Sequence, residues 1–341
     1  MGRKWLYWFE ELKTTDNDLV GKKCANLGEM TRIGMRIPPG FAISIEGYER
    51  FMAETGAGEE IRRFVEEHKD HLKEVKAQIQ ASQKIRTIIE SKEMPADMRE
   101  ELFQFYDQLK EKAGGKELSV AVRSSGAVSM PGQMESYLNV RRRESVLQKV
   151  IQVWGSAFTT RAIAFRLEKG MAMDKAPIGI AVLKMVEAKS AGVVLTVLPT
   201  IGDTSKVVVE GNWGLGESVV SGEINPDQFI MDKETGEVES TISRKTKMVI
   251  YHDKGTIMVD VPREMQEKSC VDPEELKEIV RIAKKVEDHF ECPQDMEWVL
   301  DQSQTSPDNL YWVQARPAKF SKVKEKEAEY LAELMTRMFK F

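Results

Sequence analysis

Two carboxylates, an amide and a guanidinium stand close together near the end of the sequence, in segments with the alternation of β-strands. Because side chains alternate between the two faces of a strand, Asp295 and Glu297 are expected to share one face. By the same alternation, Trp312, Gln314 and Arg316 are expected to share a face of the next strand. Carboxylate and amide oxygens suit Mg²⁺, and a guanidinium neutralises charge on a transferred phosphoryl group. The pattern predicts a site for a Mg-bound polyphosphate, although an ordinary half-exposed hairpin would show the same residues.

A stretch rich in small residues, at positions 120–140, could form a second part of such a site. It reads VAVRSSGAVSMPGQMESYLNV, so a predicted strand delivers Arg123 into a loop of Ser and Gly. Small residues let backbone N–H groups approach phosphates, and an arginine can hold a phosphate through two hydrogen bonds. The alternative is a glycine-containing hairpin that carries a surface arginine.

Two more glycine-containing segments have the composition of phosphate-binding loops. Near the N-terminus, Lys22 and Lys23 follow Gly21 and precede a predicted helix, although the segment does not match the GxxxxGK[ST] pattern. Residues 211–217, GNWGLGE, follow a predicted strand, but no helix with an acid about 20 positions later completes a dinucleotide fingerprint. A glycine-rich connection between strands explains that segment equally well.

The elements that must position these residues change in character along the chain. Residues 58–116 are dense in charge with apolar residues at helical spacing, which predicts two or three exposed amphipathic helices. His68 and His71 lie there at a spacing that could hold a metal, but nothing completes a ligand set, so a solvated helix face is preferred. From residue 117 to 270, β-rich runs alternate with glycine turns, and one helix is expected at 143–165. The expected strands cover residues 118–122, 178–185, 192–197, 206–209, 228–232 and 247–250.

The last quarter of the chain has the clearest helix signal. Asp272, Pro273 and Glu275 match an N-cap, a proline at the first helical position and an acid at the third. The apolar stripe that follows comprises Leu276, Ile279, Ala283, Val286 and Phe290. Two strands are predicted at 296–300 and 310–314, before a final helical segment. Strands combined with a helix-rich insertion predict an α+β fold rather than a regular alternation of strands and helices.

Length and composition limit the classes of protein to which the chain can belong. At 341 residues it is long enough for about two domains. Lys and Arg number 50 and Asp and Glu number 55, so the near-balanced charge gives no reason to expect nucleic acid or a membrane as partner. The longest uncharged stretch, 190–202, is shorter than the roughly 20 residues that span a bilayer. Three cysteines without a CxxC pair, and no signal peptide, predict a cytoplasmic protein.

Several segments, taken in order, resemble one family. They read LVGKKCANLGEM, IPPGFAIS, VAVRSS with GQMESYLNV, FTTRAIAFR, WGLGESVVSGEINPDQF, DMEWVLD and YWVQARP. Over residues 15–320 the chain resembles the nucleotide-binding region of the dikinases: phosphoenolpyruvate synthase, pyruvate phosphate dikinase and rifampicin phosphotransferase. The resemblance implies an ATP-grasp fold in which two lobes clamp Mg-ATP. The implied lobes are 1–177, with a helical insertion at about 58–116, and 178–320, followed by a helical tail at 321–341.

The resemblance also implies roles for individual residues. Catalytic charge stabilisation would come from Lys23, Arg123 and Arg316. Nucleotide contacts would come from Lys23, Arg123, Gly132, Ser136, Glu217, Gln314 and Arg316. The ligands of Mg²⁺ would be Asp295, Glu297 and Gln314. Relatives often have Gln before the Lys-Met pair that meets the adenine, and Leu183 stands at that position here.

A further departure concerns histidine. The resemblance implies a phosphoryl-accepting histidine in a Thr-Ser-His type motif, and none of the four histidines stands in such a motif. We therefore expect an ATP-binding subunit that passes a phosphoryl or pyrophosphoryl group to a histidine on a partner subunit, with AMP and phosphate released. The chain is most similar in this respect to the ATP-binding subunit of phenylphosphate synthase, with phenol as acceptor. The alternatives are the ATP module of a split pyruvate, water dikinase or antibiotic phosphotransferase, and a catalytically silent nucleotide-binding protein.

Overall fold

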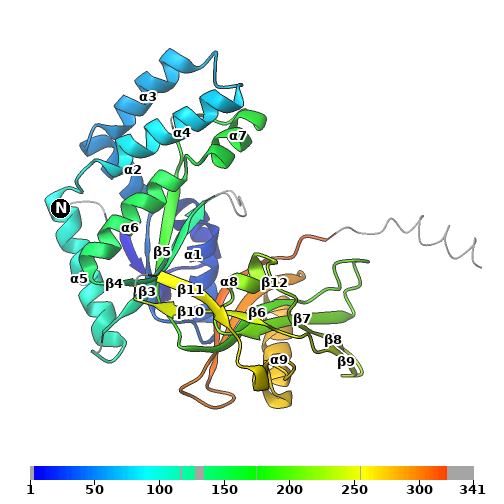
Figure 1. The fold of residues 1–341 in the computed structure, drawn as a ribbon. Coiled ribbons are helices and arrows are strands. Elements are labelled where there is room, and N and C mark those ends of the chain that lie inside the picture. The colour runs from blue at the N-terminus through cyan, green and yellow to red at the C-terminus, as the bar shows by residue number, and fades with distance from the viewer. Residues whose placement is uncertain (1–3, 116, 127–133, 174, 254, 321–341) are drawn as a thin grey trace, which may run out of the picture. The chain divides into compact units, whose positions relative to one another are not determined.

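The computed structural model describes residues 4–320 except 116, 127–133, 174 and 254, and these residues form two compact units (Figure 1). Unit 1 holds the chain up to Val186 together with Tyr251–Ile257, and unit 2 holds Glu187–Ile250 and the residues from Met258 onward. Each unit combines an antiparallel sheet with helices, so the predicted α+β class is confirmed. The predicted C-terminal helical tail and Gly132 lie outside the described residues.

Unit 1 is built on a five-stranded sheet in the order β1-β2-β5-β3-β4, with every neighbouring pair antiparallel. Its strands are β1 (Leu6–Trp8), β2 (Gly40–Ile43), β3 (Ser119–Gly126), β4 (Ser136–Arg141) and β5 (Ile178–Lys184). The resemblance to the dikinases implies that the last of these strands begins the second lobe, at residue 178. That assignment differs from the structure, because β5 pairs with both β2 and β3 and is buried at the centre of the first sheet.

Helices surround this first sheet. They are α1 (Asn17–Arg32), α2 (Ile45–Glu54), α3 (Ala57–His68), α4 (Val75–Glu90), α5 (Ala96–Lys112), α6 (Arg143–Ser156) and α7 (Thr160–Glu168), with 3₁₀ turns at Phe9–Glu11 and Thr14–Asp16. The predicted helical insertion is therefore three helices, α3 to α5, and α3, α4 and α7 lie together in Figure 1. Val120 and Val122 of β3 are buried in the same core as Val150 and Trp154 of α6, so α6 covers one face of the sheet.

The single helix predicted at 143–165 is two helices in the structure. The break falls where Thr159 takes an extended conformation, with φ −58° and ψ 156°. Its side chain then accepts a hydrogen bond from the backbone N–H of Ala162, at 3.2 Å, and so caps α7. A threonine at a helix N-terminus is a common start signal. Apolar residues lie on both sides of Thr159, so the sequence pattern predicts one continuous helix.

Unit 2 contains a six-stranded antiparallel sheet in the order β13-β12-β6-β7-β8-β9. Its strands are β6 (Ala188–Leu195), β7 (Lys206–Trp213), β8 (Asp227–Asp232), β9 (Val238–Thr241), β12 (Gln294–Asp301) and β13 (Leu310–Pro317). A separate two-stranded sheet of β10 (Lys247–His252) and β11 (Gly255–Asp260) is divided between the units, because Tyr251–Ile257 belong to unit 1. The helices of unit 2 are α8 (Glu217–Val220) and α9 (Pro273–Phe290), with a 3₁₀ turn at Arg263–Met265.

Helix α9 begins as its sequence predicts. The Asp272 carboxylate accepts hydrogen bonds from the backbone N–H groups of Glu274 and Glu275, and the Glu275 carboxylate accepts one from the backbone N–H of Asp272. This capping box satisfies N–H groups that would otherwise lack partners at the start of a helix. The buried stripe that includes Ile279 and Ala283 then packs against β12, β6, β7 and β13, so α9 covers one face of the second sheet. No helix in the described ranges is long and apolar enough to cross a membrane.

A buried ion pair in unit 2 gives a stability prediction. Lys245 and Asp227 are both fully buried, with Nζ 2.6 Å from Oδ1, and Asp227 also accepts from the backbone N–H groups of Ser243 and Cys270. Lys245→Ala would leave a buried carboxylate without its cation, so we expect a loss of about 3–5 kcal/mol in unfolding free energy by urea denaturation. The matched control Lys206→Ala breaks a partly exposed pair with Asp232, and its loss should be much smaller because water screens that pair. Equal losses in the two variants would contradict the prediction.

Candidate functional site

A glycine breaks helix α1 just before the lysine pair. Gly21 has φ 76° and ψ 160°, and a Cβ built on it would lie 1.9 Å from the carbonyl oxygen of Ser125. The backbone N–H of Cys24 donates to Ser125 Oγ at 3.0 Å. The segment around Lys23 is therefore packed against the end of β3, and a side chain at Gly21 would prevent this approach. Lys23 is partly buried there and Lys22 is exposed, which agrees with Lys23 as the candidate.

Arg123 and Ser136 share a face of the first sheet. They lie directly opposite one another in the antiparallel β3–β4 pair, so their side chains point to the same side. Ser125, which contacts the glycine of α1, lies on that face too because it is two residues from Arg123. The structure thus brings Arg123, Ser136 and the Lys23 segment to one end and one face of this sheet.

The second group of candidate residues lies on β12 and β13. Asp295 lies opposite Arg316, and Glu297 lies opposite Gln314, so all four side chains share one face of the second sheet. The other face carries Met296 and Trp298, which are buried. The alternation that predicts a common face for these four residues is therefore matched by the register of the two strands.

The prediction that Trp312 shares a face with Gln314 and Arg316 is wrong. A register shift between Glu297 and Trp298 makes Val313 an extra residue on β13, so Trp312 lies opposite Trp298. Its indole is 1% exposed and belongs to the core on the face opposite Gln314. The bulge moves the aromatic ring away from the polar face and leaves that face to the carboxylates, the amide and the guanidinium.

Asp295 has a cation as its partner. Arg316 donates from Nε and Nη2 to Asp295 Oδ2, at 2.9 and 2.7 Å. An arginine held in this way is oriented for an incoming anion, since its third nitrogen is directed by the other two. This contact favours Asp295 as the residue that orients Arg316, and it leaves Glu297 as the more direct candidate for a metal ligand.

The polar face extends further across the second sheet than the sequence indicates. Glu297 lies opposite Val193 of β6, Val193 opposite Glu210 of β7, and Glu210 opposite Gln228 of β8. The Gln228 amide donates to Glu210 Oε1 at 2.8 Å. Sequence reasoning missed these two residues because only the strand order places them in one row with the hairpin.

Glu217 begins α8 and is exposed. A Cβ on the preceding Gly216 would lie 3.5 Å from the Cβ of Ala191, which shares a face of β6 with Val193. The short helix therefore lies over the polar face of the second sheet. Leu183, at the predicted adenine position, is 2% exposed and lies within the first sheet between Gly40 and Ala121.

Whether the hairpin could hold a magnesium ion depends on its oxygen donors. Within the described part of the chain, no group of three or more His, Cys, Asp or Glu side chains forms a metal cluster. Mg²⁺ does not need one, because it usually takes one or two carboxylates and completes its six ligands with water and phosphate oxygens. Glu297 with Gln314 opposite it provides such a partial set, so these residues fit a magnesium ion that is bound together with a phosphate ligand.

The fold and these sites define an α+β protein with an arginine on one sheet, a lysine segment packed against that sheet, and a carboxylate–amide–guanidinium face on a second sheet. The chain belongs to the family described as pyruvate phosphate dikinase, AMP/ATP-binding domain, whose model matches residues 17–336. The predicted resemblance to the dikinases is thereby confirmed, and ATP is the ligand that the family description supports.

Curated relatives match over nearly all of this chain. A probable phosphoenolpyruvate synthase of Methanocaldococcus jannaschii is 38% identical over 95% of the chain and 27% of the relative's own length. The phosphoenolpyruvate synthase of Pyrococcus furiosus is 35% identical over 93% of the chain and 44% of its own length. That of Aeropyrum pernix is 36% identical over 96% of the chain and 44% of its own length. The chain therefore spans less than half the length of these relatives.

Proposed function

We propose that the chain binds Mg-ATP and passes a phosphoryl or pyrophosphoryl group to a histidine on another polypeptide segment, with AMP and phosphate released. The observation that carries the proposal is the face shared by Asp295, Glu297, Gln314 and Arg316. A protein that only sensed nucleotide would not need two carboxylates, an amide and an oriented arginine together. This retained set argues against the catalytically silent alternative.

The residues of this chain would act by position and charge. Arg123 of the first sheet and Lys23 of α1 would hold the phosphates, with Ser136 opposite Arg123. Arg316, oriented by Asp295, would stabilise negative charge on the group in transfer. A magnesium ion held by Glu297 and Gln314 would neutralise phosphate oxygens when it is bound. The chemistry then requires little more than alignment of the phosphates with their acceptor.

The accepting histidine is proposed to come from outside these 341 residues. His68 and His71 lie on and next to α3 in the helical insertion, His252 at the end of β10, and His289 on α9. None of them lies on β3, β4, β12 or β13, the described strands that carry Arg123, Ser136 and the hairpin residues. His68 is also engaged locally, since its ring stacks on Phe64 and its Nδ1 lies 2.8 Å from the Phe64 carbonyl oxygen.

For the final acceptor, pyruvate is favoured over phenol. The similar proteins are named phosphoenolpyruvate synthases, and these names give no support to phenylphosphate synthase. We therefore propose a pyruvate, water dikinase type of reaction, with the carrier histidine and the pyruvate site supplied by polypeptide that these 341 residues do not include.

Arg123→Ala tests the nucleotide site. Loss of a charged hydrogen-bonding group from the phosphates should weaken binding of a non-hydrolysable ATP analogue by about tenfold or more, measured by calorimetry with Mg²⁺ present. The matched control is Arg141→Ala, because Arg141 lies opposite Ser119 at the other end of the same strand pair. Equal affinities in the two variants would remove Arg123 from the site.

A further inference from the structure

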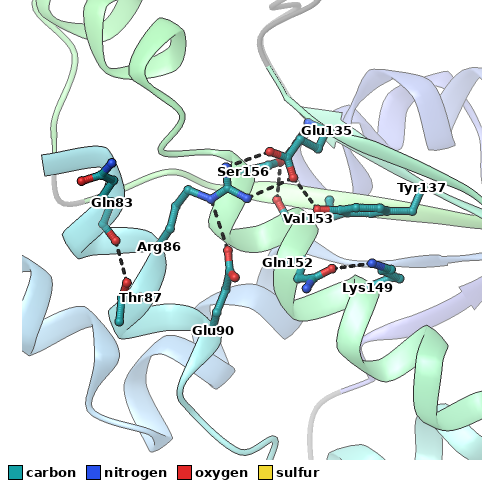
Figure 2. Close-up of polar contacts among 10 residues, drawn as sticks. All are labelled: Gln83, Arg86, Thr87, Glu90, Glu135, Tyr137, Lys149, Gln152, Val153 and Ser156. Carbon is teal, nitrogen blue, oxygen red and sulfur yellow. Dashed lines mark hydrogen bonds and ion pairs between the residues drawn. The ribbon is translucent and has the colours of Figure 1, made fainter. Parts of the chain in front are cut away.

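An arginine of the helical insertion contacts the residue just before the strand that carries Ser136. Figure 2 shows Arg86 reaching from α4 to Glu135, which directly precedes β4. Nη1 donates to Glu135 Oε1 at 2.7 Å and Nη2 donates to Oε2 at 3.1 Å. The third nitrogen, Nε, donates to Glu90 Oε1 at 3.2 Å. The guanidinium is thus fixed on its own helix and bound to both oxygens of Glu135.

Glu135 is also held by groups that do not belong to the insertion. The Tyr137 hydroxyl donates to Glu135 Oε2, and the backbone N–H of Glu135 donates to Ser156 Oγ at 3.1 Å (Figure 2). Ser156 is fully buried in α6 and donates in turn to the carbonyl oxygen of Val153 at 2.8 Å. Both the side chain and the backbone of Glu135 therefore have defined partners.

Helices α4 and α6 approach each other closely beside this network. A Cβ on Gly155 would lie 3.0 Å from Glu90 Oε1, so α6 presents a glycine where α4 brings its carboxylate. Glu90 is the residue that also accepts from Arg86. The position of Arg86 is therefore set by the packing of α4 on α6, which belongs to the core of unit 1.

The network lies immediately beside the candidate phosphate residues. Tyr137 lies opposite Val122, and Ser136 lies opposite Arg123. Tyr137 faces the side of the sheet that α6 covers, because the Lys149 Nζ of α6 lies 4.2 Å from its ring centroid. Ser136 and Arg123 then face the other side. Anything that moves the start of β4 must change the placement of Ser136 relative to Arg123.

We propose that Arg86 is a positioning residue of the nucleotide site, which through Glu135 fixes the start of β4 and so the spacing between Ser136 and Arg123. The inference rests on the proposed nucleotide role of these two residues. It also gives the helical insertion a part in ATP binding that its exposed, charge-rich sequence does not indicate.

Folding stability alone does not account for such a network. The side chains of Arg86 and Glu135 are 28% and 35% exposed, and ion pairs at this exposure contribute little to stability. A contact through both oxygens nevertheless fixes geometry closely, because a carboxylate bound by two nitrogens of one guanidinium cannot rotate freely. Removing Arg86 should therefore affect the phosphate site more than the stability of the chain.

Arg86→Ala tests the proposal against nucleotides that differ in their phosphates. Arg86→Ala should weaken binding of a non-hydrolysable ATP analogue by about tenfold, because small displacements of phosphate-binding groups have large effects. Binding of AMP should change by less than about twofold, since AMP lacks the terminal phosphates. Arg86→Lys should recover only part of the loss, because a lysine cannot bind both oxygens of Glu135 in the same fork. The measurement is calorimetry of the whole chain with Mg²⁺, beside urea denaturation of each variant.

The control variant is Arg143→Ala, which removes a different ion pair, a single contact from Nη1 of Arg143 on α6 to Oδ2 of Asp107 on α5 at 2.9 Å. This variant should bind AMP and the ATP analogue as tightly as the unchanged protein does. Tyr137→Phe is a second test, because it removes only the hydroxyl that donates to Glu135. It should weaken binding of the ATP analogue without weakening binding of AMP. Arg86 would have no positioning role if Arg86→Ala and Arg143→Ala bound the ATP analogue with equal affinity. The same would follow if Arg86→Ala weakened binding of AMP as much as binding of the ATP analogue.

A double variant separates this proposal from the proposed function itself. In an Arg123→Ala background, Arg86→Ala should cause little further loss of affinity for the ATP analogue. Arg86 is proposed to set the position of Ser136 relative to Arg123, and the Arg123 side chain is already absent. Full additivity of the two losses would overturn the positioning role. Failure of the proposed nucleotide role would show differently, as unchanged affinity in Arg123→Ala alone.

Discussion

Glu297→Gln is expected to lower phosphoryl transfer by about a hundredfold or more while binding of Mg-ATP persists in weakened form. Glutamine keeps the size and the hydrogen-bonding oxygen of the side chain, but it removes one negative charge from the face that carries Gln314 and the Asp295–Arg316 pair. A neutral amide oxygen holds Mg²⁺ less tightly, and a displaced ion would no longer neutralise the group in transfer. The measurement is AMP formation with the histidine-bearing polypeptide present, beside calorimetry of nucleotide binding.

The matched control for this variant is Glu239→Gln. Glu239 lies on β9 at the edge of the same sheet, is exposed and pairs with Ile230 rather than with the polar row. It should leave both binding and transfer unchanged. Wild-type turnover in Glu297→Gln would make Glu297 an ordinary strand residue and would remove the observation on which the proposed function depends.

The parts of the fold that could be predicted from the sequence depend on local signals. The start of α9 is one, because the cap, the proline and the acid act within four consecutive residues, and the structure shows the predicted capping box. The face shared by Asp295 and Glu297, and that shared by Gln314 and Arg316, are others, because alternation within each strand determines them, whereas the register of the two strands brings the pairs to one face. The bulge at Val313 could not be predicted, since it depends on how two strands pair.

Other features depend on contacts between distant segments. Residues 178–184 have a clear strand sequence, but the sequence does not say which sheet the strand joins, and β5 joins the first. Glu210 and Gln228 carry no motif, and only the order of β6, β7 and β8 places them in line with Glu297. The link from Arg86 to Glu135 likewise joins residues 49 positions apart. A single sequence contains no signal for such pairings.

The dependence on an external histidine gives the other large expected effect. With β-³²P-ATP, this chain alone should acquire no acid-labile label and should form almost no AMP, because none of its histidines lies on the strands that carry Arg123, Ser136 and the hairpin residues. Adding the histidine-bearing polypeptide should transfer the label to that polypeptide. Pyruvate should then discharge the label as a phosphorylated product and phenol should not, because the similar proteins are named phosphoenolpyruvate synthases.

Each outcome of this experiment identifies a different step. Label on the added polypeptide that phenol discharges would keep the dikinase chemistry and restore the phenol assignment. Stable label on His68, His71, His252 or His289, or full turnover by the chain alone, would contradict transfer to an external histidine. A variant of this chain with all four histidines replaced by glutamine provides the control, since it should still deliver label to the added polypeptide. Transfer that survived in this variant but disappeared in Glu297→Gln would place the chemistry at the hairpin and the acceptor outside the chain.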